Sequence, residues 1–311
     1  MSSEFAISTL SAQTQPTFKS IFSSEFFKLL HNRMVTTFAA IIFGIFAINI
    51  LGTTVIFTSI LSINKSSDAQ SNLFLMNTLW MQVLQTNMSW SGIMMIFLTV
   101  MAIGQDYQNG VIRVILARGA GRMRVLAAKY TAALLYAFFV LIAQYIVTAA
   151  FLFSALSVSN NLDLLNRMPS NISQEIILYG LVTLVSVIVT GFMAAALTTL
   201  GRSLTFGFAF ALLWFPVEGI LKFMAMVLSA AYSLQFYETV NKITNAFLGS
   251  AITNLGSQIF TQNGQTVTPL TVNGFTLSAP SALTDGIIIT VYAAIFLVGM
   301  FTYARMKDVQ N

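Results

Sequence analysis

Two ionisable side chains, Glu218 and Lys222, interrupt the otherwise apolar stretch 204–228. They lie four residues apart, so they would share one face of a helix. Ionisable groups inside a membrane-spanning helix are costly and commonly functional. One interpretation is an intramembrane ion pair that transfers protons or ions. The other is a self-neutralising pair near the end of the helix, with the lysine reaching toward the membrane surface.

Most other kinds of site chemistry are excluded or disfavoured by the residues present. The chain has no cysteine, which excludes thiol nucleophiles, cysteine-ligated zinc and iron–sulfur clusters. Its single histidine, His31, disfavours a histidine-based metal site. It also lacks the G-x-x-x-x-G-K-[ST] pattern of a phosphate-binding loop. We therefore predict no catalysis, no metal and no cofactor in this chain.

The segment 105–129 (QDYQNGVIRVILARGAGRMRVLAAK) is short, basic and amphipathic. It predicts a short helix, then a glycine turn, then a basic entry into the next apolar stretch. One interpretation is that Val111 and Ile112 bind a groove on a soluble partner, with Asp106 and Arg113 fixing its orientation. The alternative is an ordinary positively charged loop whose arginines bind anionic lipid headgroups.

These segments must be positioned by a membrane-spanning scaffold. The chain is 56% hydrophobic and only 8% charged, whereas soluble domains carry about 25% charged residues. A bilayer core of about 30 Å needs about 20 apolar residues per helix. Six stretches qualify, and they lie at about 35–61, 86–104, 130–156, 176–200, 204–228 and 286–304. We therefore predict an all-α integral membrane protein with six spans, the fifth of which bends near Pro216 into outer helices.

The basic residues are concentrated in alternate loops and at both termini. On one side we place Lys19, Lys28, Arg33, Arg113, Arg118, Arg122, Arg124, Lys129, Arg202, Arg305 and Lys307. By the positive-inside rule this side is cytoplasmic, and both termini lie there, as an even number of spans requires. Charge distributed in this way does not form a nucleic-acid-binding face.

Three regions outside the spans complete the organisation. Residues 1–34 predict a cytoplasmic tail followed by an amphipathic helix lying on the membrane surface. Residues 35–305 form the six-helix domain, including an extracytoplasmic loop at 229–283 with re-entrant or interfacial helices. Two Asn-Gly pairs in that loop, at 263–264 and 273–274, predict tight turns. Residues 306–311 predict a short cytoplasmic tail.

The 105–129 segment resembles the matching loop of the permease subunits of type-2 ATP-binding-cassette exporters. Those permeases show an acidic residue, a Gly-Thr pair, a Leu-rich stretch, a Pro turn, an Arg and then a Lys. The positions that match at the same spacing are Asp106, Gly110, Leu116, Arg122 and Lys129. Two positions depart from the pattern, since Val111 stands where Thr is usual and Gly119 where Pro is usual.

The resemblance extends to other parts of the chain. Glu25, Lys28 and Arg33 resemble the charged surface helix that precedes the family's first span. The small-residue run 191–201 resembles the exit of its fourth span, and the ending 303–308 its basic tail.

The resemblance implies a transport function that depends on other subunits. It implies two ATPase subunits that bind ATP and magnesium, and a second permease chain, identical or related. In this family the coupling residues would be Asp106, Gly110, Val111, Ile112, Arg113, Leu116 and Arg122. Because the fifth span lies near the dimer axis in the family, Phe208, Trp214 and Phe215 would line a pathway. The nearly charge-free spans suit an amphipathic or hydrophobic substrate, such as a drug, lipid or peptide.

Two other functions remain open from the sequence. One is an ion- or proton-coupled secondary carrier, for which Glu218 and Lys222 are the candidate groups. The other is a non-transporting membrane anchor for a soluble partner. As a permease, the chain would be a multi-pass protein of the cell membrane. Its compact size is similar to that of bacterial permeases.

Overall fold

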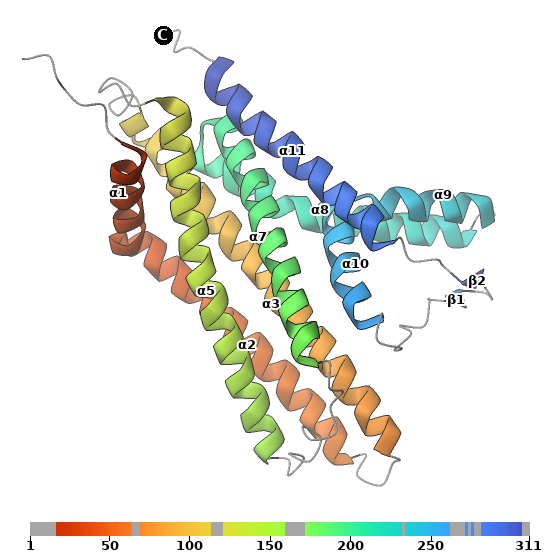
Figure 1. The fold of residues 1–311 in the computed structure, drawn as a ribbon. Helices are drawn as coiled ribbons and strands as arrows, with labels where there is room; N and C mark the ends of the chain where they lie inside the picture. The colour runs from red at the N-terminus through yellow and green to blue at the C-terminus, as the bar shows by residue number, and fades with distance from the viewer. Residues whose placement is uncertain are drawn as a thin grey trace, which may run out of the picture.

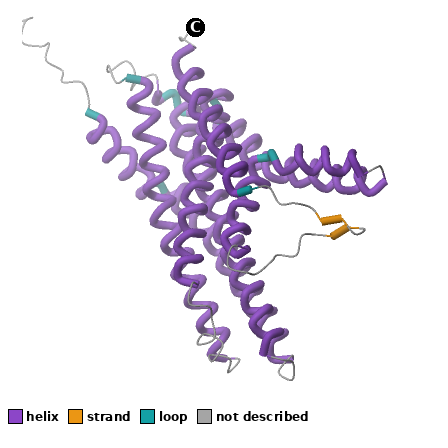
Figure 2. The backbone as a smooth tube through the Cα atoms, turned by 45° about the vertical axis from the view of Figure 1, so that its right-hand side comes forward, coloured by secondary structure: helices purple, strands orange, loops and turns teal. Residues whose placement is uncertain are grey.

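The chain folds into a bundle of long helices (Figures 1 and 2). This computed structural model describes residues 17–63, 69–112, 121–158, 172–231, 234–261, 271–272, 275–276 and 281–306. Within these described residues, six helices are long and apolar enough to cross a membrane. They are α2 (Arg33–Ile63), α3 (Ala69–Gln108), α5 (Arg122–Val158), α7 (Ile172–Gly201), α8 (Leu204–Ala231) and α11 (Ala282–Met306). The predicted all-helical membrane architecture with six spans is confirmed at this level.

Three shorter helices and a small hairpin lie between or before the spans. The helices are α1 (Phe18–His31), α9 (Leu234–Asn245) and α10 (Leu248–Thr261). The strands β1 (Thr271–Val272) and β2 (Phe275–Thr276) pair antiparallel, with Thr271 opposite Thr276. The Asn-Gly pair predicted to turn between them lies outside the described residues. So do the predicted N-terminal tail, 1–16, and all but the first residue of the predicted C-terminal tail, 306–311; Met306 is the last residue of α11.

Two spans are longer than the apolar stretches that revealed them. Helix α3 begins at Ala69 rather than near residue 86, and it extends to Gln108, so Asp106 lies on the helix. Helix α5 begins at Arg122, so Lys129 also lies on a helix rather than at its edge. Hydropathy detects only the part of a helix suited to lipid, whereas polar flanking residues can continue the same backbone hydrogen-bond ladder.

The fifth span does not break into the outer helices at Pro216. Helix α8 contains Pro216 and continues to Ala231, and the outer helices begin only at Leu234. The end of α8 and α9 lie side by side and project away from the bundle in both views (Figures 1 and 2).

Side-chain caps define the ends of several helices. Thr17 accepts a hydrogen bond from Ser20 N at the start of α1. Asn32 joins α1 to α2, because its Oδ1 accepts from Met34 N (3.0 Å) while its Nδ2 donates to Gln105 Oε1 on α3 (2.9 Å). Such caps satisfy backbone donors that a helix leaves unpaired at its N-terminus. The corner between α1 and α2 is thereby fixed to α3.

Helix α3 is the centre of the bundle. It packs against α2, α5, α7, α8 and α10. In its most apolar window 83% of the residues are buried, against 17% for α2, α8 and α11. The peripheral spans therefore present apolar faces outward, as a bilayer or a membrane partner requires.

Candidate functional site: a charged cluster between α1, α3 and α5

Four charged side chains from three helices meet at the end of the bundle where α1 lies. Glu25 and Lys28 come from α1, Asp106 from α3 and Lys129 from α5. Lys129 Nζ lies 2.7 Å from Glu25 Oε2, and it also donates to Asp106 Oδ2. Lys28 Nζ donates to Asp106 Oδ1 and lies 3.9 Å from Glu25 Oε2. We call these four residues the charged cluster.

The charged cluster is largely removed from solvent. The side chains of Asp106 and Lys129 are each 1% exposed, that of Glu25 is 9% exposed, and only Lys28 reaches solvent, at 42%. Two carboxylates and two ammonium groups make the cluster neutral overall. Buried charges persist only when they are paired and hydrogen-bonded, and removing one partner of such a pair is strongly destabilising.

Apolar packing beside the charged cluster holds α1 on α5. Ile21 of α1 is buried with Val125 and Ala128 of α5. Glu25 follows Ile21 by four residues and Lys129 follows Val125 by four, so each helix carries its buried charge one turn beyond its buried apolar residue. This packing brings Glu25 and Lys129 into contact, a pairing that the sequence analysis did not predict.

The predicted coupling residues lie close to the charged cluster along the chain. Helix α3 ends at Gln108, three residues before Val111. Between them Gly110 adopts a positive φ of 68°, a backbone conformation that glycine tolerates without steric cost. Val111 and Ile112 are helical, and Val111 is 36% exposed. Arg113 and Leu116 lie outside the described residues, so most of the predicted coupling helix does too.

Two other basic residues predicted for this region lie at the starts of helices. Arg33 is the first residue of α2 rather than part of the surface helix, which ends at His31. Arg33 is exposed. Arg122 begins α5 and is half-buried. Arg33 forms no ion pair with Glu25 or Asp106 among the pairs found in the described part of the chain.

Glu218 and Lys222 do not form the predicted ion pair within the described residues. Trp214 Nε1 donates to Glu218 Oε1 (2.6 Å), and the backbone N of Gly249 donates to Oε2 (2.7 Å). Lys222 Nζ instead lies 3.4 Å from Ser250 Oγ. Helix α10 begins at Leu248, so Glu218 accepts from its N-terminal end, where a carboxylate is favoured. Each of the two charged side chains of α8 therefore contacts α10, and they do not contact each other.

The three aromatic residues predicted to line a pathway pack against the chain's own core. The ring of Phe208 lies 5.7 Å from that of Phe97 on α3, and the ring of Trp214 lies 5.7 Å from that of Phe296 on α11. Phe215 lies close to Gly249. Their contribution to a pathway remains a prediction.

A buried polar contact between α3 and α5 was missed by the sequence analysis. Asn87 Nδ2 donates to Thr148 Oγ1 (3.0 Å), and Ser91 Oγ donates to Gln144 Oε1 (2.6 Å). All four side chains are buried. The signal was present, because each helix carries two polar residues four positions apart within an apolar stretch.

Among the described residues, no group of three or more His, Asp or Glu side chains could hold a metal ion. The charged cluster offers only two carboxylates, and both are already paired with lysines. No protein-family model, curated protein or solved structure matches the chain.

Proposed function

We propose that the chain is the permease subunit of an ATP-driven exporter of the type-2 ATP-binding-cassette class. The observation that carries the proposal is the charged cluster. It unites Asp106 and Lys129, which flank the loop that resembles this class, with Glu25 and Lys28, which resemble its surface helix. Residues that match the pattern in separate segments thus belong to one contact.

In this proposal the end of the bundle that carries α1 faces the cytoplasm. The positive-inside rule supports this orientation, because Lys19, Arg33, Arg122 and Arg202 all lie at helix ends or turns on that side. Both termini are then cytoplasmic. The outer loop at 229–283, with α9 and α10, lies on the opposite side, where the two helices are re-entrant or interfacial.

The proposed mechanism transmits force through the charged cluster. Two ATPase subunits, which bind ATP and magnesium, close on ATP and push against the loop that follows α3 at Val111 and Ile112. Because Asp106 is paired with Lys129 of α5 and with Lys28 of α1, a displacement of the end of α3 reaches all three helices together. These three helices would then form one unit whose position ATP binding at a distant site changes, so that the permease alternates between two states.

A second permease chain would complete the pathway for an amphipathic or hydrophobic substrate. The outward faces of α2 and α8 are apolar, and they include Ile48 and Phe223, which are 72% and 66% exposed. Such faces suit either lipid or a second membrane chain.

The test uses the full chain purified from its native membrane in mild detergent. We expect an ATPase subunit with a G-x-x-x-x-G-K-[ST] loop to copurify and to hydrolyse ATP. Val111→Glu places a charge on the proposed docking surface and should abolish copurified ATPase activity. Asn109→Glu, two residues away at an exposed polar position, is the matched control and should retain it. Equal activity in both variants would contradict the proposed coupling surface.

The secondary-carrier alternative gains no support from Glu218. This carboxylate is held by Trp214 and by the start of α10, an arrangement that suits a fixed structural link. Transport that depends on an ion gradient and continues without ATP would favour the carrier over the permease.

A further inference from the structure

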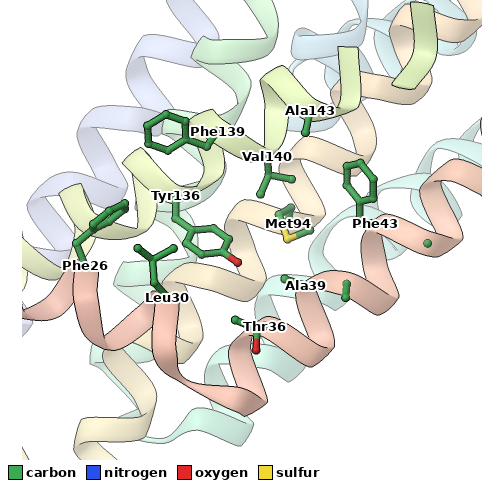
Figure 3. Close-up of a pocket in the computed structure, with 12 residues that line it drawn as sticks. Phe26, Leu30, Thr36, Ala39, Phe43, Met94, Tyr136, Phe139, Val140 and Ala143 are labelled. Carbon is green, nitrogen blue, oxygen red and sulfur yellow. The ribbon is translucent and has the colours of Figure 1, made fainter. Parts of the chain in front are cut away.

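An apolar groove of about 700 Å³ lies between α1, α2 and α5, with α3 as its floor (Figure 3). Phe26 and Leu30 of α1 close one end, Phe43 of α2 and Phe139 of α5 form its walls, and Met94 lies at its floor. The groove is independent of the charged cluster, since none of the four cluster residues lines it.

The lining of the groove offers almost nothing for water to bind. Its only side-chain hydroxyls belong to Thr36 and Tyr136, and Thr36 Oγ1 already donates to backbone carbonyls of its own helix. A bound water needs two to four polar partners. The groove is therefore better suited to an apolar occupant than to water.

The groove opens among side chains that face the bilayer. On α5, Phe139 is 56% exposed and Ile142 43%, and on α2 Ile41 is 51% exposed. Both helices are membrane-spanning candidates. The lining residues of α2 belong to its half nearest α1, and those of α5 lie around its midpoint. In a bilayer the opening would therefore contact hydrocarbon, with α2 placing it in the leaflet on the α1 side.

A positive charge marks the surface end of the groove. Arg33 precedes the lining residue Ala40 by seven residues on α2, so it lies on the same face of the helix, about 10 Å nearer to its start. On α1, Lys19 likewise precedes the lining residue Phe26 by seven residues. Arg33 and Lys19 are both exposed. The acidic residue of α1, Glu25, is buried against Lys129 and does not cancel this charge.

We propose that this groove is a binding site for one anionic glycerophospholipid of the leaflet on the α1 side. An acyl chain fills the space between α2 and α5, and the phosphate lies near Arg33. The bound lipid fills the space between the α1–α2 corner and α5, and the charged cluster separately connects α1 to α5. The site depends only on membrane insertion and not on the proposed transport function.

The experiment measures lipid retention by native mass spectrometry of the full chain in detergent supplemented with phosphatidylglycerol or phosphatidylcholine. We expect one retained phosphatidylglycerol per chain. Ala143→Trp fills the groove and should abolish its retention. Ala150→Trp, on the exposed surface of the same helix outside the groove, is the matched control and should leave it unchanged.

The headgroup contact has its own test. Arg33→Gln should reduce the preference for phosphatidylglycerol over phosphatidylcholine by about fivefold, the effect expected for one basic side chain near an anionic lipid. Lys242→Gln, an exposed lysine on α9, should leave the preference unchanged.

A second measurement keeps the proposal falsifiable if Ala143→Trp fails to fold. Phosphatidylglycerol with a photoreactive acyl chain should label the α5 segment that contains Phe139 and Ala143 in the unaltered chain, and excess phosphatidylglycerol should compete. Three results would overturn the site: equal retention in the two tryptophan variants, labelling spread evenly over the spans, or displacement of the lipid by a transported compound. A missing ATPase would overturn the proposed function and leave this site intact.

Discussion

The charged cluster and the Glu218–Lys222 region place opposite charges close together but bind them in different ways. In the charged cluster, two carboxylates and two lysines from three helices pair directly with one another. On α8, Glu218 and Lys222 lie on one helical face, yet each binds a partner outside the pair. The difference indicates that charged side chains pair across helices when packing brings a counter-charge to them, and that they otherwise bind backbone or polar groups.

The largest expected effect comes from breaking the charged cluster. Lys129→Met leaves Asp106 and Glu25 buried with only Lys28 to balance them, which should destabilise the protein by about 3–5 kcal/mol. Thermal unfolding in detergent measures the loss. Combining Lys129→Met with Glu25→Gln should recover part of it, because the remaining Lys28 and Asp106 balance each other. An unchanged unfolding midpoint for Lys129→Met would contradict the pairing described for this region.

The second region should respond less and asymmetrically. Glu218→Gln retains one acceptor oxygen for two donors, so either Trp214 or Gly249 loses its partner, at about 1–3 kcal/mol. Lys222→Gln should have little effect, because Lys222 is exposed and its contact is long at 3.4 Å. Chemical unfolding of the two single variants and the double variant provides the measurement. If the two single variants lost equal unfolding free energy and the double variant lost no more than either, the result would indicate an ion pair between Glu218 and Lys222 instead.

The smallest effect is expected at the buried contact between α3 and α5, where both side chains are neutral. Thr148→Val removes the hydroxyl that contacts Asn87 and should cost about 0.6 kcal/mol, the average for polar contacts between membrane helices. Thr131→Val on the same helix removes only bonds to its own helix backbone, so it is the matched control. A double-mutant cycle with Asn87→Leu isolates the contact. A coupling energy near zero would show that this contact does not hold α3 to α5.

The sequence predicted the scaffold well because hydropathy directly reports which residues face lipid. All six spans lie where long apolar stretches occur. The ends of α3 and α5 were misplaced because polar flanking residues such as Asp106 and Lys129 continue a helix without an apolar signal.

The members of the charged cluster were identified singly, but their pairing was not. Glu25 meets Lys129 only because Ile21 packs on α5 beside Val125, and such packing between distant segments leaves no periodic signal. The four-residue spacing of Glu218 and Lys222 was misleading because it, too, contains no information about packing between distant segments. The start of α10, thirty-one residues further along the chain, supplies a partner that local spacing does not reveal.

We propose that, in an ATP-driven permease, the charged cluster would make α1, α3 and α5 move as one unit when the ATPase acts. Because the chain contains no cysteine, Ile21→Cys and Val125→Cys can be introduced together and crosslinked with no competing thiol in this chain. ATP hydrolysis by the reconstituted complex is then compared before and after crosslinking α1 to α5. The account predicts that the rate is retained, since these helices do not separate during the cycle. Loss of activity on crosslinking, restored when the link is cleaved, would contradict it.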